Sequence, residues 1–426
     1  MDTTSYHPRA RVLLEVLLED WGDGSTTESY TLDVVPMEVE VARNGPREAD
    51  TVRVEIGYRD LPLDPRSVRG ILVHVFLGDV GSADAELQMD ADTRLAFVGV
   101  IDEPSTSLEE SGEKVTLEGR DLTAFWLDHD WTASIDLDQD LPRIVEQMQA
   151  AIPGASGLTV EYAYESWALR PADVIGRTVW TPGKGEDAWT VLTQLLGAVG
   201  LIPIIELTTL RITTLESWVG TRQAVMLYGD NVERLTFRRD LKQARTQRVE
   251  LTCWDEQARE SRVASWPESP AARKVVGTDG VTEDSGAVSR QAMVGSYTVE
   301  QLKDLAKATW LERARGEFHG ELETREMLDG DGATDLTRLA AGDVLTVTLG
   351  KGDPSAFGSM SEAEAVAFLT AGARGLDRST AQALVASWRR AEDLKPWFYV
   401  QQATHRWAAS DGYHLRIEFT SMVGDE

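Results

Sequence analysis

The sequence predicts an α+β protein made mostly of antiparallel β strands, with two barrel-like domains flanking a smaller α+β domain. Segments with alternating apolar and polar residues recur about every ten residues over the first 130 positions, as in sandwiches and barrels. Similar segments return after residue 317. Between them, residues 141–200 carry apolar side chains at helical spacing. A helical insertion, residues 353–395, interrupts the last domain.

The first barrel-like domain, residues 1–130, should consist of short strands. We expect them at 31–42 (with an irregularity at Pro36), 51–58, 70–80, 95–104 and 113–121, whereas 11–18 fits a strand or a helix. The last of these strands reaches Gly119, Arg120 and Asp121 before a short helix. We expect Gly119 to permit a tight strand exit, and Arg120 and Asp121 to fix this structural turn by hydrogen bonds.

The small α+β domain, residues 131–220, should contain two helices and a strand pair. The helices are expected at 141–154 and 185–200, and the strands at 201–207 and 210–216. Residues 221–297 then form a β-rich connecting region. Its strands lie within 225–265, and residues 267–296, rich in Pro, Gly, Ser and Asp, are expected to be a loop or linker.

The last barrel-like domain, residues 298–426, should begin with a helix at 298–316. Thr298 and Gln301 form a capping box at its start. Strands are expected at 318–327 and 343–350, followed by the insertion 353–395 with two short helices, for which Ser361 and Asp377 are N-cap candidates, and a final hairpin of 397–408 and 412–423.

Composition excludes several classes of protein. The 426 residues carry a net charge of −29, which opposes nucleic-acid binding by counterion release and adhesion to anionic membranes. The single cysteine, Cys253, excludes an internal disulfide framework and a Cys-based zinc site. No apolar run approaches the roughly 20 residues of a membrane helix, and the first residues do not form a secretory signal. We expect the protein to fold in a reducing cytoplasm and not to insert into a membrane.

The charge is unevenly distributed along the chain. Residues 1–140 contain 31 acids and 11 bases, a local net charge of −20. Solubility explains such an excess, and so does a surface that repels something anionic, such as DNA passing without sticking. Residues 233–248 contain six bases, two acids and Phe237. A strand facing solvent or an acidic neighbouring subunit explains this stretch better than nucleic-acid binding.

The sequence offers no catalytic, cofactor-binding or metal-binding residues. The six histidines lack partners at metal-ligand spacing, and His74 alternates with valines as a structural strand residue does. The Asp-rich stretches 128–140 and 328–335 are expected to be turns, since the first lacks the glycine and the second the closing glutamate of a calcium loop. Residues 181–189 contain Gly and Lys before a helix but lack the ending of a phosphate loop.

Tryptophans are frequent, with thirteen in the chain. Most occupy apolar positions of expected elements, including Trp126, Trp189, Trp254, Trp310 and Trp388. A protein core or a subunit interface is the expected place for them. A carbohydrate platform has no supporting spacing.

Four segments, in this order along the chain, resemble the baseplate hub proteins of phage tails and contractile injection machines, the tail hub or late control gene D-like family. They are 51–78, 97–128 (FVGVIDEP to VTLEGRDLTAFWLD), 181–201 (TPGKGEDAWTVLTQLLGAVGL), and 295–323 with 339–349. The resemblance spans nearly the whole chain. The insertion 353–395 has no counterpart in the family core. The sequence contains no spike module with β-helix repeats, and we expect the spike to be a separate protein.

The resemblance implies a structural protein of the virion tail baseplate, not an enzyme. It implies a homotrimer whose barrel-like domains alternate in a ring of six similar units, joining the sixfold tail tube to the threefold spike. DNA or cargo would pass through its channel without specific binding. The implied partners are the tail tube, central spike, baseplate wedge and tape-measure proteins, with assembly in the bacterial host cytoplasm.

Two alternatives remain open from the sequence. A glycan hydrolase would use two of the many carboxylates, and would require two acids in one apolar cleft with a tryptophan nearby. A secreted binding module would be a monomer with an exposed aromatic patch.

Overall fold

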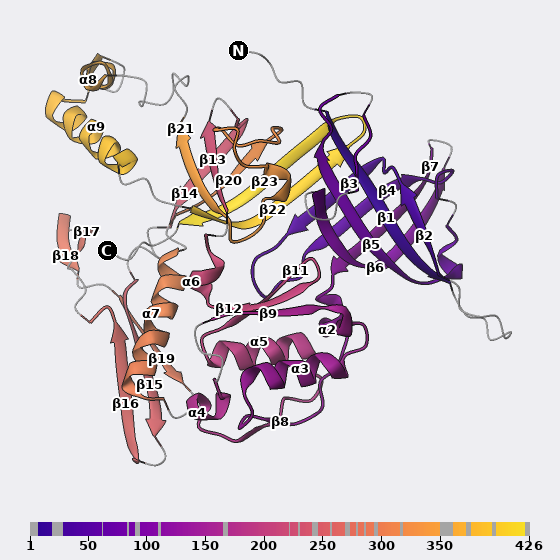
Figure 1. Ribbon diagram of the computed structural model, residues 1–426. Helices are drawn as coiled ribbons and strands as arrows, with labels where there is room; N and C mark the ends of the chain where they lie inside the picture. Colours follow the sequence, from indigo (N-terminus) through magenta and orange to yellow (C-terminus); the bar gives the residue numbers. More distant parts are fainter. Residues whose placement is uncertain are drawn as a thin grey trace.

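The computed structural model (Figure 1) is an α+β fold dominated by antiparallel strands, as the sequence predicts. It describes residues 7–18, 29–61, 63–82, 85–89, 94–109, 112–164, 169–220, 222–228, 231–240, 246–255, 258–268, 273–277, 280–284, 287–293, 297–315, 318–349, 361–371, 376–393 and 398–421. Among these residues, no helix is both long enough and apolar enough to cross a membrane.

A sheet of thirteen strands combines the first and last parts of the chain. The strands are β1 (Pro8–Leu18), β2 (Ser29–Val34), β3 (Glu38–Arg43), β4 (Thr51–Gly57), β5 (Val68–Asp79), β6 (Leu95–Glu109), β7 (Gly112–Asp121), β13 (Gln223–Tyr228), β14 (Arg234–Arg239), β20 (Phe318–Thr324), β21 (Val344–Leu349), β22 (Phe398–Ala408) and β23 (Gly412–Ser421). Eleven of them follow the order β14–β20–β23–β22–β3–β4–β7–β6–β5–β1–β2. β21 attaches to β22 and pairs with β13.

Strict alternation explains why these segments form strands. In β3 and β4, Val39, Val41, Val52 and Val54 are buried, while the polar residues between them lie on the opposite face. The ambiguous segment 11–18 is part of strand β1. The strand predicted over 31–42 is instead divided into β2 and β3, with Pro36 between them, because proline cannot donate to a strand ladder.

The two β-rich ends of the chain share one sheet and one core. β22 pairs with β3 from Ala403–Arg43 to Ala408–Glu38. A single hydrophobic cluster extends from Val12 in β1 to Phe419 in β23. The strand order runs from β14 to β2, and the pairs between described strands do not close a barrel. The described strands therefore do not show the two expected barrels. What is confirmed is that both ends of the chain are β-rich.

The α+β unit lies beneath the main sheet and has its own core. Its elements are α2 (Ala124–Leu127), β8 (Ile135–Asp136), α3 (Leu141–Ala151), β9 (Thr159–Ala163), α4 (Pro171–Ile175), β10 (Val179–Trp180), α5 (Ala188–Ala198), β11 (Ile202–Glu206), β12 (Thr209–Thr213) and α6 (Leu215–Trp218). Trp126 and Trp189 meet edge-to-face, with ring centroids 6.4 Å apart. Both predicted helices and the predicted strand pair are confirmed.

A second small unit contains α7 (Val299–Arg315) and the strands that precede it in the chain. Its strands are β15 (Thr246–Asp255), β16 (Glu260–Trp266), β17 (Arg273–Gly277), β18 (Gly280–Asp284) and β19 (Ala287–Met293). Leu302 and Ala306 of α7 pack with Val249 and Leu251 of β15. The sequence grouped this helix with the last barrel-like domain, whereas here it packs on the preceding strands. Whether the chain divides into four domains stays a prediction.

The prediction of a loop or linker over 267–296 is wrong, because β17, β18 and β19 lie there. These strands have only five to seven residues each. Turn-forming residues therefore dominate any sequence window that spans several of them. The opposite face of β15 carries Trp254, which is 56% exposed and is not a core residue within this chain.

The helices predicted in the insertion are present as α8 (Glu362–Ala371) and α9 (Arg378–Asp393), between β21 and β22. Ser361 accepts a hydrogen bond from the Glu364 amide, and Asp377 accepts one from the Thr380 amide, so both N-caps are confirmed. The pair has a small core of its own. The side chain of Trp388 lies outside the described residues.

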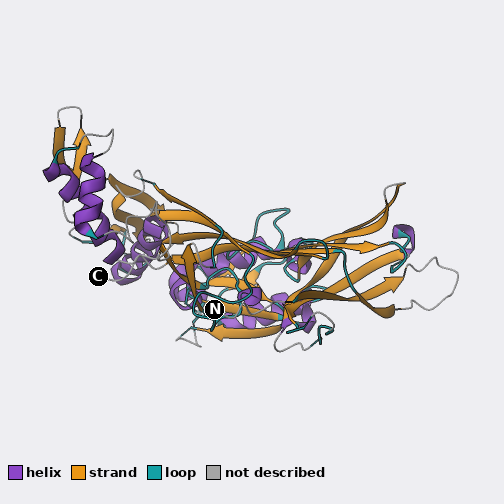
Figure 2. Ribbon diagram, turned by 90° about the horizontal axis from the view of Figure 1, so that it is seen from above, coloured by secondary structure: helices purple, strands orange, loops and turns teal. Residues whose placement is uncertain are grey.

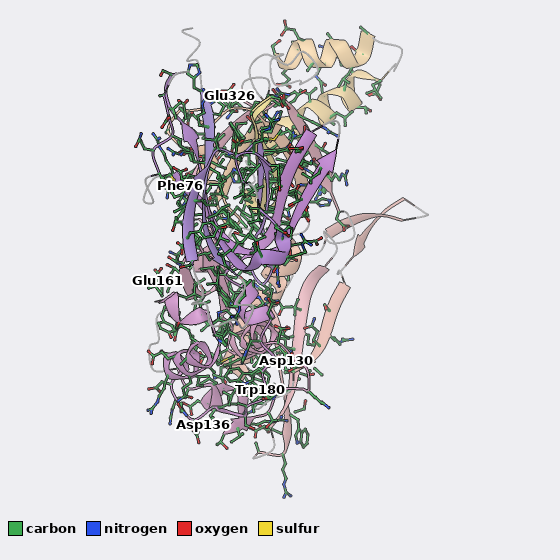
Figure 3. All side chains as sticks on the ribbon, turned by 90° about the vertical axis from the view of Figure 1, so that its right-hand side faces the viewer. Phe76, Asp130, Asp136, Glu161, Trp180 and Glu326 are labelled. Carbon is green, nitrogen blue, oxygen red and sulfur yellow. The ribbon has the colours of Figure 1, made fainter. Side chains whose placement is uncertain are left out.

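The molecule is elongated, and the long strands of the main sheet follow its length (Figure 2). In side view, Phe76 of β5 lies in the upper, β-rich part, and Glu161, Asp130 and Asp136 lie in the α+β unit below it (Figure 3). We call the region where the main sheet and the α+β unit meet the junction.

Candidate functional site

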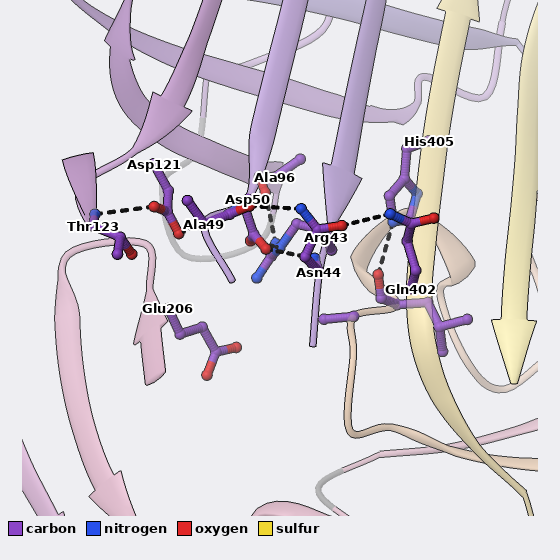
Figure 4. Close-up of polar contacts among 12 residues, drawn as sticks. Arg43, Asn44, Ala49, Asp50, Ala96, Asp121, Thr123, Glu206, Gln402 and His405 are labelled. Atoms are coloured by element: carbon purple, nitrogen blue, oxygen red, sulfur yellow. Dashed lines mark hydrogen bonds and ion pairs between the residues drawn. The ribbon is translucent and has the colours of Figure 1, made fainter. Parts of the chain in front are cut away.

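Three charged side chains are buried at the junction between the main sheet and the α+β unit (Figure 4). Arg43 ends β3, Asp50 precedes β4 and Asp121 ends β7. Arg43 Nε lies 2.6 Å from Asp50 Oδ2. The Asp50 amide donates to Asp121 Oδ2 at 3.2 Å, and the Thr123 amide donates to Asp121 Oδ1 at 3.0 Å. We call Arg43, Asp50 and Asp121 the junction cluster.

The loop between β3 and β4 connects the junction cluster to other parts of the chain. Gln402 Nε2 of β22 donates to Asn44 Oδ1 at 2.5 Å. Trp189 Nε1 of α5 donates to the carbonyl of Arg47 at 3.0 Å. Arg47 has a positive φ of 81°, a conformation uncommon for a side chain of this size. The loop thus fixes the position of the α+β unit against the sheet.

A cavity of about 150 Å³ lies beside this loop. Two tryptophans and charged groups of both signs line it, among them Trp189, Trp218, Glu206, Arg211, Arg222 and Asp343. The arginines lie near carboxylates: Arg222 Nη1 is 3.7 Å from Asp343 Oδ2, and Arg211 Nη1 is 3.6 Å from Glu206 Oε2. Among the described residues, no group of His, Cys, Asp and Glu is placed to hold a metal ion.

The second feature is the polar face of the main sheet, which we call the charged face. It is formed by polar side chains of the eight consecutive strands from β14 to β6. In one row across the sheet, Arg406, Glu40, Arg53, Glu118 and Glu103 stand opposite one another on neighbouring strands. Opposite charges on adjacent strands stabilise a sheet, and like charges destabilise it.

Comparison with known proteins identifies the fold. No family model matches the sequence, and no curated protein matches it. A tail protein from Neisseria meningitidis MC58 matches in structure, with a TM-score of 0.59 and 14% identity over 97% of both chains. The 43 kDa tail protein of prophage MuSo2 from Shewanella oneidensis matches with a TM-score of 0.53 and 13% identity, over 95% of this chain and 97% of that one. The chain has the fold of phage tail proteins.

A third match carries this tail-protein fold outside phages. An E. coli protein, described as a type VI secretion component structurally similar to the T4 tail proteins gp27 and gp5, has a TM-score of 0.50 and 12% identity. The match covers 91% of this chain and 74% of that one. The resemblance to tail hub proteins is thereby confirmed at the level of the fold.

Gly119, Arg120 and Asp121 lie within β7, not in a turn beyond it. A Cβ on Gly119 would lie 2.1 Å from the carbonyl oxygen of Val100 in β6, so a close approach of two strands requires the glycine. Arg120 pairs with Asp102 at 2.7 Å and Asp128 at 3.1 Å. Their importance for folding and assembly stays a prediction.

Sequence reasoning missed Gly99, Arg43 and Asp50. Gly99 mirrors Gly119, since a Cβ there would lie 2.2 Å from the carbonyl of Arg120. Arg43 and Asp50 each share strand parity with buried valines, Val41 and Val52 respectively. A charged residue at an inward position next to a strand end is a readable signal of a buried pair.

The other predicted motifs have structural roles in this tail-protein fold. Asp187 caps α5 by accepting from the Thr190 amide at 2.7 Å, and Thr298 and Gln301 form the predicted capping box. Asp329 accepts bonds from the amides of Thr334 and Val225, as a turn residue does. His405 and His414 lie on neighbouring strands but on opposite faces, since His405 is buried and bonds Tyr413.

The junction cluster predicts a pH dependence. Burial and the charge of Asp50 raise the pKa of Asp121 to about 7 from an ordinary value of 3.8. The folded chain therefore holds a proton that the unfolded chain releases, and this contribution to stability is lost as pH rises from about 4 to about 7. We expect the free energy of unfolding of the wild type, measured by urea titration, to fall over this pH range relative to that of Asp121→Asn. Parallel pH profiles of the two proteins would contradict this assignment.

Proposed function

We propose that this protein is a structural baseplate hub of a phage tail or related contractile injection machine. Three copies would form a ring that joins the sixfold tail tube to the threefold spike, with a channel for DNA or cargo. The fold of the solved tail proteins supports this role. Within the machine, the partners would be the tube, spike, wedge and tape-measure proteins, and the hub would assemble in the host cytoplasm.

The single observation that carries the proposal is a repeat in the strand order. The groups β14–β20–β23–β22 and β3–β4–β7–β6 lie side by side in the main sheet. In each group, the strands appear in the chain order first, second, fourth, third. In each, the third strand, β22 or β6, has an irregular register, after Val400 or after Ile101. Three chains would thus present six similar groups.

The pairing of β22 with β3 provides the template for the contact between copies. By the repeat, β6 should pair with β14 of the next copy. Each strand pairs with one neighbour only among the described strands: β14 pairs with β20, and residues 103–109 of β6 pair with β7, with the Pro65–Ser67 turn close to β6. Applying the register of β22 and β3 places Ser107 opposite Thr236 and Leu108 opposite Leu235.

This register explains two exposed apolar side chains. Leu108 is 62% exposed and Phe237 is 48% exposed, and both lie on the core side of the sheet. In the ring they would lie on the same side of the seam and become buried. Arg238, near the end of β14, would lie close to the acidic Asp102 and Glu103 of β6. A heterologous contact of this kind closes a ring when its rotation closes, which in the proposed hub happens after three copies.

The enzymatic alternative has weaker support. The cavity at the junction contains acids and tryptophans, as a glycan hydrolase would require. Two of its acids, Glu206 and Asp343, however, lie beside arginines, which leaves them paired. The insertion with α8 and α9 is better explained as a contact for a partner specific to this machine.

Engineered cysteines test the ring. Ser107→Cys with Thr236→Cys should give, on mild oxidation, covalent dimers and trimers and nothing larger, because the ring closes at three copies. Cys253 is buried and will not interfere. The pair Ala42→Cys and Thr404→Cys, opposite each other within one chain, is the positive control. If only the control pair forms a crosslink when the assembled tail is the sample, the result contradicts the proposed seam.

A further inference from the structure

We place the charged face on the channel side of the proposed hub, although it contains arginines. Arginine is the side chain best suited to bind phosphate, because its planar guanidinium makes paired hydrogen bonds. A free arginine in such a channel would retain passing DNA. The contacts of these arginines therefore decide how the face behaves toward a polyanion.

The arginines of the central strands have carboxylate partners on more than one side. Arg53 Nη2 lies 2.9 Å from Glu55 Oε1, and its Nη1 lies 3.2 Å from Glu118 Oε1. Arg416 shows the same arrangement, 2.8 Å from Glu321 and 3.2 Å from Glu418. In both residues two nitrogens of the guanidinium are occupied.

Two more arginines repeat the pattern. Arg120 binds both oxygens of Asp102 at 2.7 Å and also contacts Asp128. Arg406 lies 2.7 Å from Glu38 and 3.9 Å from Asp411. The pKa of Arg406 is raised by its hydrogen bond to Glu38, so the pair is held in its charged form.

Stability alone does not account for this pattern. The side chains of Arg53 and Arg416 are each 52% exposed, and ion pairs in such positions contribute only about 0–1 kcal/mol. A sheet face with acids alone would be destabilised by repulsion between adjacent strands. Arginines between the acids reduce this repulsion, and each of the four arginines described above has two acidic partners.

We infer that the central part of the charged face is a non-retaining surface for double-stranded DNA, in which pairs of carboxylates occupy Arg53, Arg120, Arg406 and Arg416 and prevent them from binding phosphates. The inference rests on the proposed hub function for its biological setting. Its chemistry belongs to the isolated chain, however, in which the same face is exposed. Arg234 and Arg238 of β14 are outside this set. Arg234 has one carboxylate partner, Glu323 at 3.3 Å, and no ion pair of Arg238 is found among the described residues.

The test is DNA binding by the purified full-length chain, measured by fluorescence anisotropy with a labelled duplex oligonucleotide. The wild type should not bind at about 50 mM salt. Glu55→Gln with Glu118→Gln, or Glu321→Gln with Glu418→Gln, should bind at least about tenfold more tightly, and the binding should disappear near 200 mM salt. Adding Arg416→Ala to the second pair should abolish its gain; this pair is the cleaner one, because Glu55→Gln in the first pair also frees Lys114.

Glu40→Gln with Glu103→Gln is the matched control, because it removes the same charge from the same face. No hydrogen bond joins either acid to an arginine among the described residues, although Glu40 stands opposite Arg53 and Arg406 on the neighbouring strands. The control should bind DNA no better than the wild type. Equal gains in control and test variants would overturn the inference, as would no gain in either test pair with an unchanged unfolding transition. Neither result bears on the ring, which cysteine crosslinking tests separately.

Discussion

Replacing Gly119 with alanine should lower the free energy of unfolding by about 2–3 kcal/mol, because the added methyl group overpacks the sheet. The new Cβ would lie 2.1 Å from the Val100 carbonyl oxygen and 2.8 Å from Ile101 Cα. Both are backbone atoms, so β6 and β7 must separate to accommodate the methyl group. Urea denaturation followed by tryptophan fluorescence measures the change.

Gly70 in β5 provides the matched control. It is also a strand glycine, but a Cβ there would meet no atom within 4 Å. Gly70→Ala should leave the midpoint of unfolding unchanged or slightly higher, since alanine restricts the unfolded chain. If Gly119→Ala behaves like this control, the close approach of the two strands does not constrain the residue.

Arg43→Met should cost about 3–5 kcal/mol, since it leaves the buried carboxylate of Asp50 without its cation. Both partners are nearly inaccessible, with 11% and 12% of their side chains exposed. The loss should be smaller at pH 5 than at pH 7.5, because burial already raises the pKa of Asp50 and the unpaired group will take up a proton.

A second substitution separates lost charge pairing from lost packing. Adding Asp50→Asn to Arg43→Met removes the unpaired charge and should recover part of the stability. Arg53→Met, which breaks exposed ion pairs, should change stability by at most about 1 kcal/mol. A double variant no more stable than Arg43→Met alone would show that packing, and not charge, dominates at the junction.

Local patterns explain how much of this fold the sequence could predict. Alternation identified β4, and polar residues at helix starts identified the caps at Thr298, Ser361 and Asp377. These signals arise from residues within a few positions of one another. The strands β17 to β19 were missed because short strands and turn residues share one window.

The contacts that define the junction are not local. Asn44, which follows Arg43, accepts a hydrogen bond from Gln402, and β3 pairs with β22. In both contacts the partner lies more than 350 residues away in the chain. Nothing in the sequence near β3 indicates which strand lies beside it. Parity alone would have marked Arg43 and Asp121 as inward-facing, because each follows buried valines or leucines at alternate positions.

The pairing of β3 with β22 within one chain has a consequence for synthesis on the ribosome. At about 5–20 residues per second, roughly 20–70 s pass between translation of β3 and of β22. During that time one edge of β3 has no partner and can pair with another nascent chain. Glu38 and Glu40 lie on this edge strand, where their charges oppose such aggregation until the final hairpin is made.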